Sequence, residues 1–361
     1  MTIVAGARPN FMKIAPIIKA IHVFNEKNKK IKYRLVHTGQ HYDDKMSGDF
    51  FKQLGIPEPN VNLGAGGGTQ AHQTAAIMIG FEKEIDFHRP DVVLVVGDVT
   101  STMACTITAK KECIDVVHVE AGIRSGDMRM PEEINRMVTD SICDYFFTTT
   151  ELANANLIKN GISEERIHLV GNTMIDTLYQ NIENLIQPPI WQKNNLKQNE
   201  FFLVTLHRPA NVDNSRNLKN LLDVILRSSA PYPVLFPVHP RTKKVLEEIT
   251  YEDMNLVQMD PLGYLEFIYL VNNARCVITD SGGITEETTA LGIPCITLRD
   301  STERPETITI GTNELVGIDP NNIPPYIKKL NSGKWKKGNI PKMWDGKTAT
   351  RIINNLVDIY G

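Results

Sequence analysis

Cysteine patterns that form disulfide frameworks or metal sites are absent from this 361-residue sequence. The five cysteines are odd in number and widely spaced, with no Cys-x-x-Cys pair and no histidine at metal-ligand spacing. This excludes the framework of a small secreted domain and favours reduced, mostly buried thiols in the cytosol. No local signature of a catalytic cysteine surrounds any of them.

Long apolar runs and a dominant charge are also missing. No stretch approaches the roughly 20 apolar residues of a membrane-spanning helix. The apolar residues 1–7 are interrupted by Arg8 and lack the basic region and cleavage site of a signal peptide. A net charge of −3 leaves no basic face for nucleic acid. We therefore expect a cytoplasmic protein without a membrane or nucleic-acid partner.

Short β-branched runs alternate with longer amphipathic ones, which is typical of βαβ units and a parallel sheet. The predicted strands are 2–5, 33–37, 92–96, 116–119, 145–148, 201–206, 234–238, 256–258, 276–279 and 295–298. Predicted helices include 11–24, 70–87, 132–142, 214–226, 264–271, 284–291 and 348–360. The length and this alternation indicate an α/β protein of two Rossmann-like domains.

Residues 187–199 interrupt the alternation, because they carry two prolines followed by polar residues, as linkers do. We therefore predict an N-terminal domain over 1–187, joined by a C-terminal helix within 347–361, and a second domain over 200–346. Ligands of parallel sheets bind beyond the carboxyl ends of the strands. The polar residues that follow strands, in a cleft between the two domains, are thus the candidates for a site.

The most distinctive local signal is an Asp-Ser-Gly-Gly segment that joins a buried strand to a helix. Gly282 and Gly283 let the backbone approach a phosphate, and the N–H groups and dipole of the helix favour an anion there. Ser281 can donate a hydrogen bond as well, and Glu287, one turn into the helix, can accept one from a ribose diol. The alternative is that Ser281 only caps the helix.

Three cations follow strands in the same way. Arg304 lies in a loop after a strand, where it could contact a phosphate or simply be solvated. Arg8 and Lys13 follow the first strand, which ends in Gly-Ala-Arg-Pro rather than in a dinucleotide fingerprint. The Gly-Lys-Thr sequence at 346–348 lacks the upstream glycine of a P-loop, so nothing indicates NTP hydrolysis.

Carboxylates and a histidine complete the pattern. Asp98 and Glu120 follow strands, Glu132 and Glu133 open a helix, and His207 follows the first strand of the second domain. Carboxylates favour a developing oxocarbenium ion, and cations favour a departing diphosphate. The acids of the helix start could instead serve only the helix dipole. The carboxylates could also hold a divalent metal, but no ligand spacing indicates this.

Taken in order and spacing, these motifs resemble the non-hydrolysing UDP-N-acetylglucosamine 2-epimerases, which share the GT-B fold. The similarity extends from Gly-Ala-Arg-Pro at 6–9 to Glu-Arg-Pro-Glu at 303–306. Its most specific parts are His-Val-Glu-Ala-Gly at 118–122, Pro-Glu-Glu-Ile-Asn-Arg at 131–136, Leu-His-Arg at 206–208 and Asp-Ser-Gly-Gly at 280–283.

The resemblance implies a role for each matched residue. Substrate would be held by Ser281, Gly282, Gly283 and Glu287 at the diphosphate and ribose, by Phe267 at the uracil, and by Arg8, Lys13, His207 and Arg304 mainly on the phosphate side. Asp98, Glu120 and Glu132 would be the catalytic carboxylates, and His207 is counted with them. The implied reaction is anti elimination of UDP to 2-acetamidoglucal followed by re-addition, in a homodimer, without metal or cofactor.

Two places depart from the family pattern. Asn10 stands where many members carry an acid, and we expect it to tune the site rather than abolish activity. The Gln-His-Tyr-Asp segment at 40–43 and the glycines of 64–68 differ from bacterial members that bind a second, activating UDP-GlcNAc. The sequence therefore does not predict activation by substrate.

Four alternatives stay open. A hydrolysing epimerase would release UDP and free N-acetylmannosamine, and a related epimerase would act on a modified UDP-GlcNAc such as a uronic acid. A GT-B glycosyltransferase has the same fold, but it needs an acceptor groove, of which the sequence shows no sign. A non-catalytic sensor would not need the acidic residues and His207.

Overall fold

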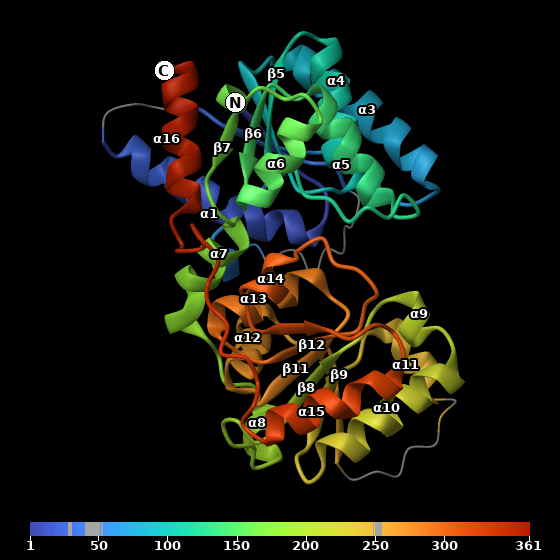
Figure 1. Cartoon of the computed structure of the whole chain (residues 1–361). Helices are drawn as coiled ribbons and strands as arrows, with labels where there is room; N and C mark the ends of the chain where they lie inside the picture. The colour runs from blue at the N-terminus through green and yellow to red at the C-terminus, as the bar shows by residue number, and fades with distance from the viewer. Residues whose placement is uncertain (28–30, 40–50, 52, 248, 250–254) are drawn as a thin grey trace. The chain divides into compact units, whose positions relative to one another are not determined.

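The computed structural model describes residues 1–27, 31–39, 51, 53–247, 249 and 255–361, without the side chains of 8, 209, 210, 240 and 241. The chain forms two compact units: unit 1 comprises Met1–Gln180 with Lys342–Gly361, and unit 2 comprises Asn181–Pro341. Figure 1 shows the helices and strands of each unit. The segment 40–43, on which the prediction about substrate activation depends, lies outside the described residues.

Unit 1 is built on a parallel sheet of order β3-β2-β1-β4-β5-β6-β7 among the described strands. Its central strand is wholly buried and has the sequence Val-Val-Leu-Val-Val, as expected of a parallel strand covered on both faces. The strands are β1 (Thr2–Ala5), β2 (Arg34–His37), β3 (Val61–Asn62), β4 (Val92–Val96), β5 (Asp115–Ala121), β6 (Tyr145–Thr148) and β7 (Ile167–Leu169).

The helices of unit 1 pack in two groups. Helices α3, α4 and α5 are successive neighbours, and Ile77 and Phe81 of α3 share a core with Val93 and Val95. Helix α16 packs on α1. The helices are α1 (Arg8–Asn25), α3 (Gln70–Phe87), α4 (Thr100–Lys111), α5 (Pro131–Ile142), α6 (Glu151–Lys159), α7 (Thr173–Asn181) and α16 (Thr348–Tyr360).

Helix α16 is held in unit 1 at its own first turn. Asp176 accepts hydrogen bonds from the backbone N–H groups of Thr348 (3.0 Å) and Ala349 (2.7 Å). The buried indole of Trp344 donates to the carbonyl of Thr149 (3.2 Å) just before the helix. The chain therefore leaves unit 1, forms unit 2 and returns.

Unit 2 contains a parallel sheet of order β10-β9-β8-β11-β12-β13 within the part of the chain that is described. Its strands are β8 (Phe202–Thr205), β9 (Val234–Pro237), β10 (Leu256–Met259), β11 (Cys276–Thr279), β12 (Cys295–Thr297) and β13 (Asn313–Leu315). Its helices are α8 (Pro189–Lys193), α9 (Pro209–Val212), α10 (Ser215–Ser229), α11 (Pro240–Glu247), α12 (Tyr264–Asn273), α13 (Gly282–Leu291), α14 (Glu306–Thr309) and α15 (Ile323–Asn331). The predicted class, α/β with two parallel-sheet domains, is confirmed.

The predicted linker differs from what the structure shows. Residues 189–193 form α8, and Trp191 packs edge-on against Phe201 and Tyr269, with ring centroids 5.8 and 5.3 Å apart. Leu196 is buried in the same core. Polar composition hid these two apolar anchors, so this segment is part of unit 2 rather than a free connection.

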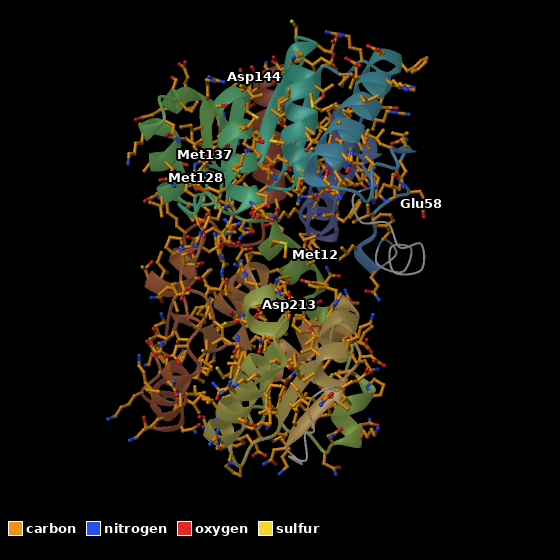
Figure 2. The ribbon with its side chains drawn as sticks, turned by 90° about the vertical axis from the view of Figure 1, so that its right-hand side faces the viewer. Met12, Glu58, Met128, Met137, Asp144 and Asp213 are labelled. Carbon is orange, nitrogen blue, oxygen red and sulfur yellow. The ribbon has the colours of Figure 1, made fainter. Side chains whose placement is uncertain are left out.

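Helix α5 carries its charges on the inside. Glu133, Arg136 and Asp140 are buried, whereas Ile134 and Met137 are exposed (Met137 is labelled in Figure 2). Burying charged groups is costly unless they are paired, so the inward face of α5 serves purposes other than apolar packing.

Among the described helices, none is long and apolar enough to cross a membrane.

Candidate active site

Glu120 and Lys13 form an ion pair among the predicted site residues of unit 1. Glu120, at the end of β5, is only 4% exposed, and its backbone has φ +72°, where the pairing with β6 shifts register. Lys13 of α1 forms an ion pair with its carboxylate. A Cβ added to Gly97 would lie 2.9 Å from Lys13 Nζ and 3.2 Å from Glu120 Oε2. Glycine at 97 therefore makes room for this pair.

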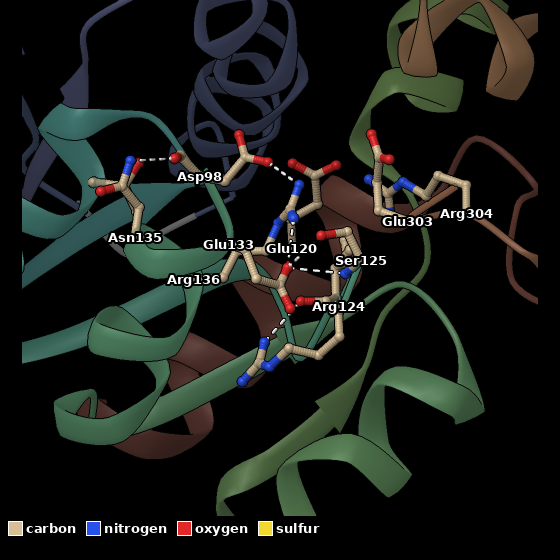
Figure 3. A network of polar contacts seen from close by, with 12 residues as sticks. Asp98, Glu120, Arg124, Ser125, Glu133, Asn135, Arg136, Glu303 and Arg304 are labelled. Atoms are coloured by element: carbon tan, nitrogen blue, oxygen red, sulfur yellow. Dashed lines mark hydrogen bonds and ion pairs between the residues drawn. The ribbon is translucent and has the colours of Figure 1, made fainter. Parts of the chain in front are cut away.

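Asp98 lies beside a different cation. Its carboxylate pairs with the guanidinium of Arg136, and its carbonyl accepts a hydrogen bond from the Asn135 side chain at 2.8 Å. Figure 3 shows these contacts at the start of α5. The Asp98 side chain is 27% exposed, whereas Arg136 is 4% exposed. The buried Arg136 thus holds the Asp98 carboxylate in place while part of the carboxylate stays accessible.

The two adjacent glutamates of α5 have different surroundings. Glu133 accepts hydrogen bonds from the N–H of Ser125 (2.9 Å) and Gly126 (3.1 Å) and pairs with Arg136 (2.9 Å). Burial raises the pKa of Glu133, but these donors outweigh it and leave its pKa below the ordinary value. Glu132, the predicted catalytic residue, is partly exposed in the first turn. Glu133 thus holds the loop of Ser125 and Gly126, and Glu132 is the more exposed of the two glutamates.

Asn10 has a structural reason to be an amide. Its Oδ1 accepts from the backbone N–H of Gly6 and Ala7, both at 3.1 Å, and its Nδ2 donates to the carbonyl of Val96 at 3.1 Å. A carboxylate could accept the first two bonds but could not make the third. Asn10 therefore ties the turn after β1 to the end of β4. Arg8 begins α1, and its side chain is not described.

In unit 2, a buried aspartate organises the ends of β8 and β11. Asp280 accepts hydrogen bonds from the backbone N–H of Arg208 (3.0 Å) and from the Asn211 side chain (2.9 Å). Its Oδ1 lies 2.7 Å from Nδ1 of His207, whose ring is 57% exposed. Burial raises the pKa of Asp280, but the contact with His207 and these donors hold the pKa below its ordinary value. His207 is thus oriented with its other nitrogen available.

The Ser-Gly-Gly turn opens helix α13 as predicted from the sequence. Ser281 stands at the N-cap, its N–H donates to Thr279 Oγ1 at 3.0 Å, and its hydroxyl makes no capping hydrogen bond. Simple capping by Ser281, the alternative reading, is therefore not what this conformation shows. The hydroxyl and the first-turn N–H groups of Gly282 and Gly283 suit an anion.

Glu287 and Arg304 lie deeper than the sequence suggested. Burial raises the pKa of Glu287 to about 8, with Tyr264 lowering it and Glu286 raising it further. Arg304 is buried rather than exposed in its loop, and it forms an ion pair with Glu286. Its place in the core argues against the solvated alternative. Phe267 is half-buried on α12 at the edge of the core.

Several residues of these groups were not predicted to be functional. Asp280, Asp140 and Arg299 are buried charged groups, and Arg299 pairs with Glu303 at 2.6 Å next to Gly282. The pairing of Glu133 with Arg136 could have been predicted, because residues three apart lie on one helix face. No pattern in the sequence indicated the partners of Asp280, Asp140 and Arg299. Within the described residues, no group of three or more His, Cys, Asp or Glu is arranged to hold a metal.

Comparison with known proteins gives these groups a context. Residues 24–357 match the family model described as UDP-N-acetylglucosamine 2-epimerase. The UDP-N-acetylglucosamine 2-epimerase of Methanocaldococcus jannaschii is 42% identical over 100% of this chain and 99% of its own.

The chain belongs to the UDP-N-acetylglucosamine 2-epimerase family.

A solved structure and one further relative refine this placement. The crystal structure of the M. jannaschii epimerase in complex with UDP-GlcNAc and UDP superimposes with a TM-score of 0.86 at 41% identity, covering 100% of this chain and 99% of that one. A Pseudomonas aeruginosa UDP-2,3-diacetamido-2,3-dideoxy-D-glucuronate 2-epimerase is 39% identical over 87% of each chain. The predicted family and its GT-B-like fold are confirmed, and the matches support an epimerase. The roles of the individual site residues remain predictions.

Proposed function

We propose that this epimerase interconverts UDP-N-acetylglucosamine and UDP-N-acetylmannosamine without hydrolysing either. The observation that carries the proposal is the pairing of Glu120 with Lys13 beside Asp98, on a chain with full-length similarity to an epimerase solved with UDP-GlcNAc and UDP. Inversion at C2 requires a proton to leave one face and return to the other. Positioned carboxylates are suited to that transfer.

The reaction that these groups suit is elimination followed by addition. A base takes the C2 proton, the C1–O bond breaks with its electron pair going to UDP, and 2-acetamidoglucal is left. UDP then adds back to C1 as C2 gains a proton on the opposite face. We assign the proton transfers to the carboxylates Asp98, Glu120 and Glu132, and contact with the leaving diphosphate to Lys13 and Arg8.

Unit 2 supplies the groups that suit the nucleotide. The uncapped start of α13, with Ser281, Gly282 and Gly283, would bind the diphosphate, since helix N–H groups and the helix dipole attract anions. His207 is held at Nδ1 by Asp280, and when both ring nitrogens carry hydrogen its Nε2–H would donate to a phosphate oxygen. We place the ribose at Glu287 and the uracil at Phe267.

We propose a homodimer as the working assembly, which light scattering would test.

A second substrate is favoured by one comparison. The P. aeruginosa relative named for a diacetamido-glucuronate is nearly as similar to this chain as the M. jannaschii epimerase is. Such a uronate has the same C2 proton and the same leaving UDP, so the same groups would act on it. Discrimination between the two substrates depends on the protein side chains that contact C3 and C6 of the sugar.

The test is proton NMR of purified protein with UDP-GlcNAc in heavy water, without added metal or NAD. We expect a mixture of UDP-GlcNAc and UDP-ManNAc that is deuterated at C2. Free N-acetylmannosamine with UDP would instead make the enzyme a hydrolysing epimerase. If UDP-GlcNAc stays unchanged while the diacetamido-glucuronate is converted, the substrate proposal is overturned and the second one stands.

A further inference from the structure

A fully buried histidine lies between the two turns that carry the carboxylates of unit 1. His118 is on β5, two residues before Glu120. Its Nδ1 lies 2.7 Å from Oδ1 of Asp140, and its Nε2 lies 2.8 Å from the carbonyl oxygen of Gly97. Both ring nitrogens thus face hydrogen-bond acceptors.

These contacts determine how many protons the ring carries. A carbonyl oxygen can only accept, so Nε2 of His118 must hold a hydrogen. The Asp140 carboxylate also accepts from the N–H of Gly122 (3.1 Å) and from Arg124 (2.6 Å). The guanidinium of Arg124 is always charged, so this contact favours the ionised form of the Asp140 carboxylate. An ionised Asp140 likewise needs a hydrogen on Nδ1.

The hydrogen bonds of His118 and its partner Asp140 involve backbone groups next to Asp98 and Glu120. Gly97 directly precedes Asp98 and packs against Glu120. On the other side, Asp140 holds Gly122, which follows Glu120 by two residues. Gly122 has φ +77°, and a Cβ there would lie 2.3 Å from the Ala153 carbonyl oxygen, so only glycine fits this turn.

We propose that His118 is a buried imidazolium and acts as a positioning residue, which fixes the Asp98 turn relative to Glu120. The inference rests on the proposed epimerisation for its kinetic consequence. The protonation of the ring, however, can be measured without substrate.

The sheet contains its own reference for that measurement. His37, at the end of β2, is also fully buried, but its Nδ1 accepts a hydrogen bond from the N–H of Gly39 at 2.6 Å. Burial lowers the pKa of His37 to about 4. His37 is therefore neutral under conditions in which His118 carries two hydrogens.

The first arm is nitrogen NMR of the full-length protein with isotope-labelled histidine, with His118→Phe to assign the signals. We expect His118 to show two N–H groups, and His37 to show one ring nitrogen without hydrogen. A single N–H on His118 would overturn the proposal, whether or not the enzyme turns over UDP-GlcNAc.

The second arm is kinetic. We expect His118→Phe to lower kcat at least about a hundredfold while KM for UDP-GlcNAc and Kd for UDP change by less than about threefold. His168→Phe, the same ring replacement on β7, is the matched control and should keep the wild-type kcat. Equal losses in kcat and UDP affinity, or an unchanged kcat, would contradict a positioning role.

The isosteric Asp140→Asn covers the case in which His118→Phe does not fold. It removes the charge that faces Nδ1, and we expect kcat to fall about tenfold at constant KM. If Asp140→Asn retains the full kcat, the positioning role is rejected. Wild-type protein that leaves UDP-GlcNAc unchanged would reject the proposed function instead, with the NMR result still standing.

Discussion

Asp280, although fully buried, lies 2.7 Å from Nδ1 of the exposed His207 ring, and it is this contact that orients the imidazole. A carboxylate at that nitrogen requires a hydrogen on Nδ1 and keeps the ring in place. The residue that precedes the Ser-Gly-Gly turn therefore also positions the histidine.

Asp280→Asn is expected to separate the support of the turn from the positioning of His207. An amide can still accept from Nδ1–H, but it can also rotate and offer N–H, which turns the ring or changes its tautomer. We predict a fall in kcat of about tenfold to a hundredfold with the fold retained. Steady-state kinetics with thermal unfolding as a control will measure it, and wild-type kcat would show that Asp280 only supports the loop.

Replacement of the carboxylates one at a time identifies the group that handles the C2 proton. Glu120→Gln keeps the shape of the side chain and removes its basicity, so we expect kcat to fall about a hundred- to ten-thousand-fold. Glu132→Gln should lower kcat less, because Glu132 is partly exposed and pairs with no buried cation among the described residues. Deuterium incorporation at C2 is the readout, and a larger loss in Glu132→Gln would reverse the assignment.

The raised pKa of Glu287, about 8, predicts a pH-dependent stability. The folded state binds the proton more tightly than the unfolded state does, so this group favours folding below its unfolded pKa, and that contribution is lost as the pH rises to about 8. Glu287→Gln removes the dependence. We expect the stability of the variant relative to wild type to increase from pH 5 to pH 9, by on the order of a few kcal/mol. Urea unfolding at both pH values will show it, and a constant difference would disprove it.

Arg304→Met tests whether the buried pair with Glu286 supports the fold. Removal of one partner leaves Glu286 buried without its cation, and we expect unit 2 to lose about 3 kcal/mol. The double replacement Arg304→Met, Glu286→Leu should recover most of this loss. Denaturant unfolding of the three proteins measures it. If Arg304 served only the substrate, the single variant would be as stable as the wild type.

The positions of the strands along the chain could be predicted wherever a hydrophobic run reveals them. Each predicted strand is present in the structure, whereas β3, β7 and β13 were not predicted. These three lie at sheet edges and have only two or three residues. An edge strand pairs with a neighbouring strand on one side only, so it can be short. A strand of two or three residues contains no apolar run long enough to recognise.

The candidate site was predictable where residues follow strands, and unpredictable where a second residue from another element completes it. Asp98, Glu120, His207 and Ser281 were predicted as site residues because they lie at the ends of strands or at the start of a helix. Their partners come from elsewhere in the chain: Arg136 from α5 pairs with Asp98. The burial of Arg304 depends on Glu286 in the same way. A linear pattern contains no information about such pairing.

The return of the chain to unit 1 has a consequence for synthesis on the ribosome. Unit 2 is one continuous segment, so it can fold once residue 341 has emerged. Unit 1 must wait for α16, because Asp176 has no helix N–H groups to accept from until Thr348 and Ala349 exist. The first domain to be translated is thus the last to be completed, and the indole of Trp344 would report that event by its fluorescence.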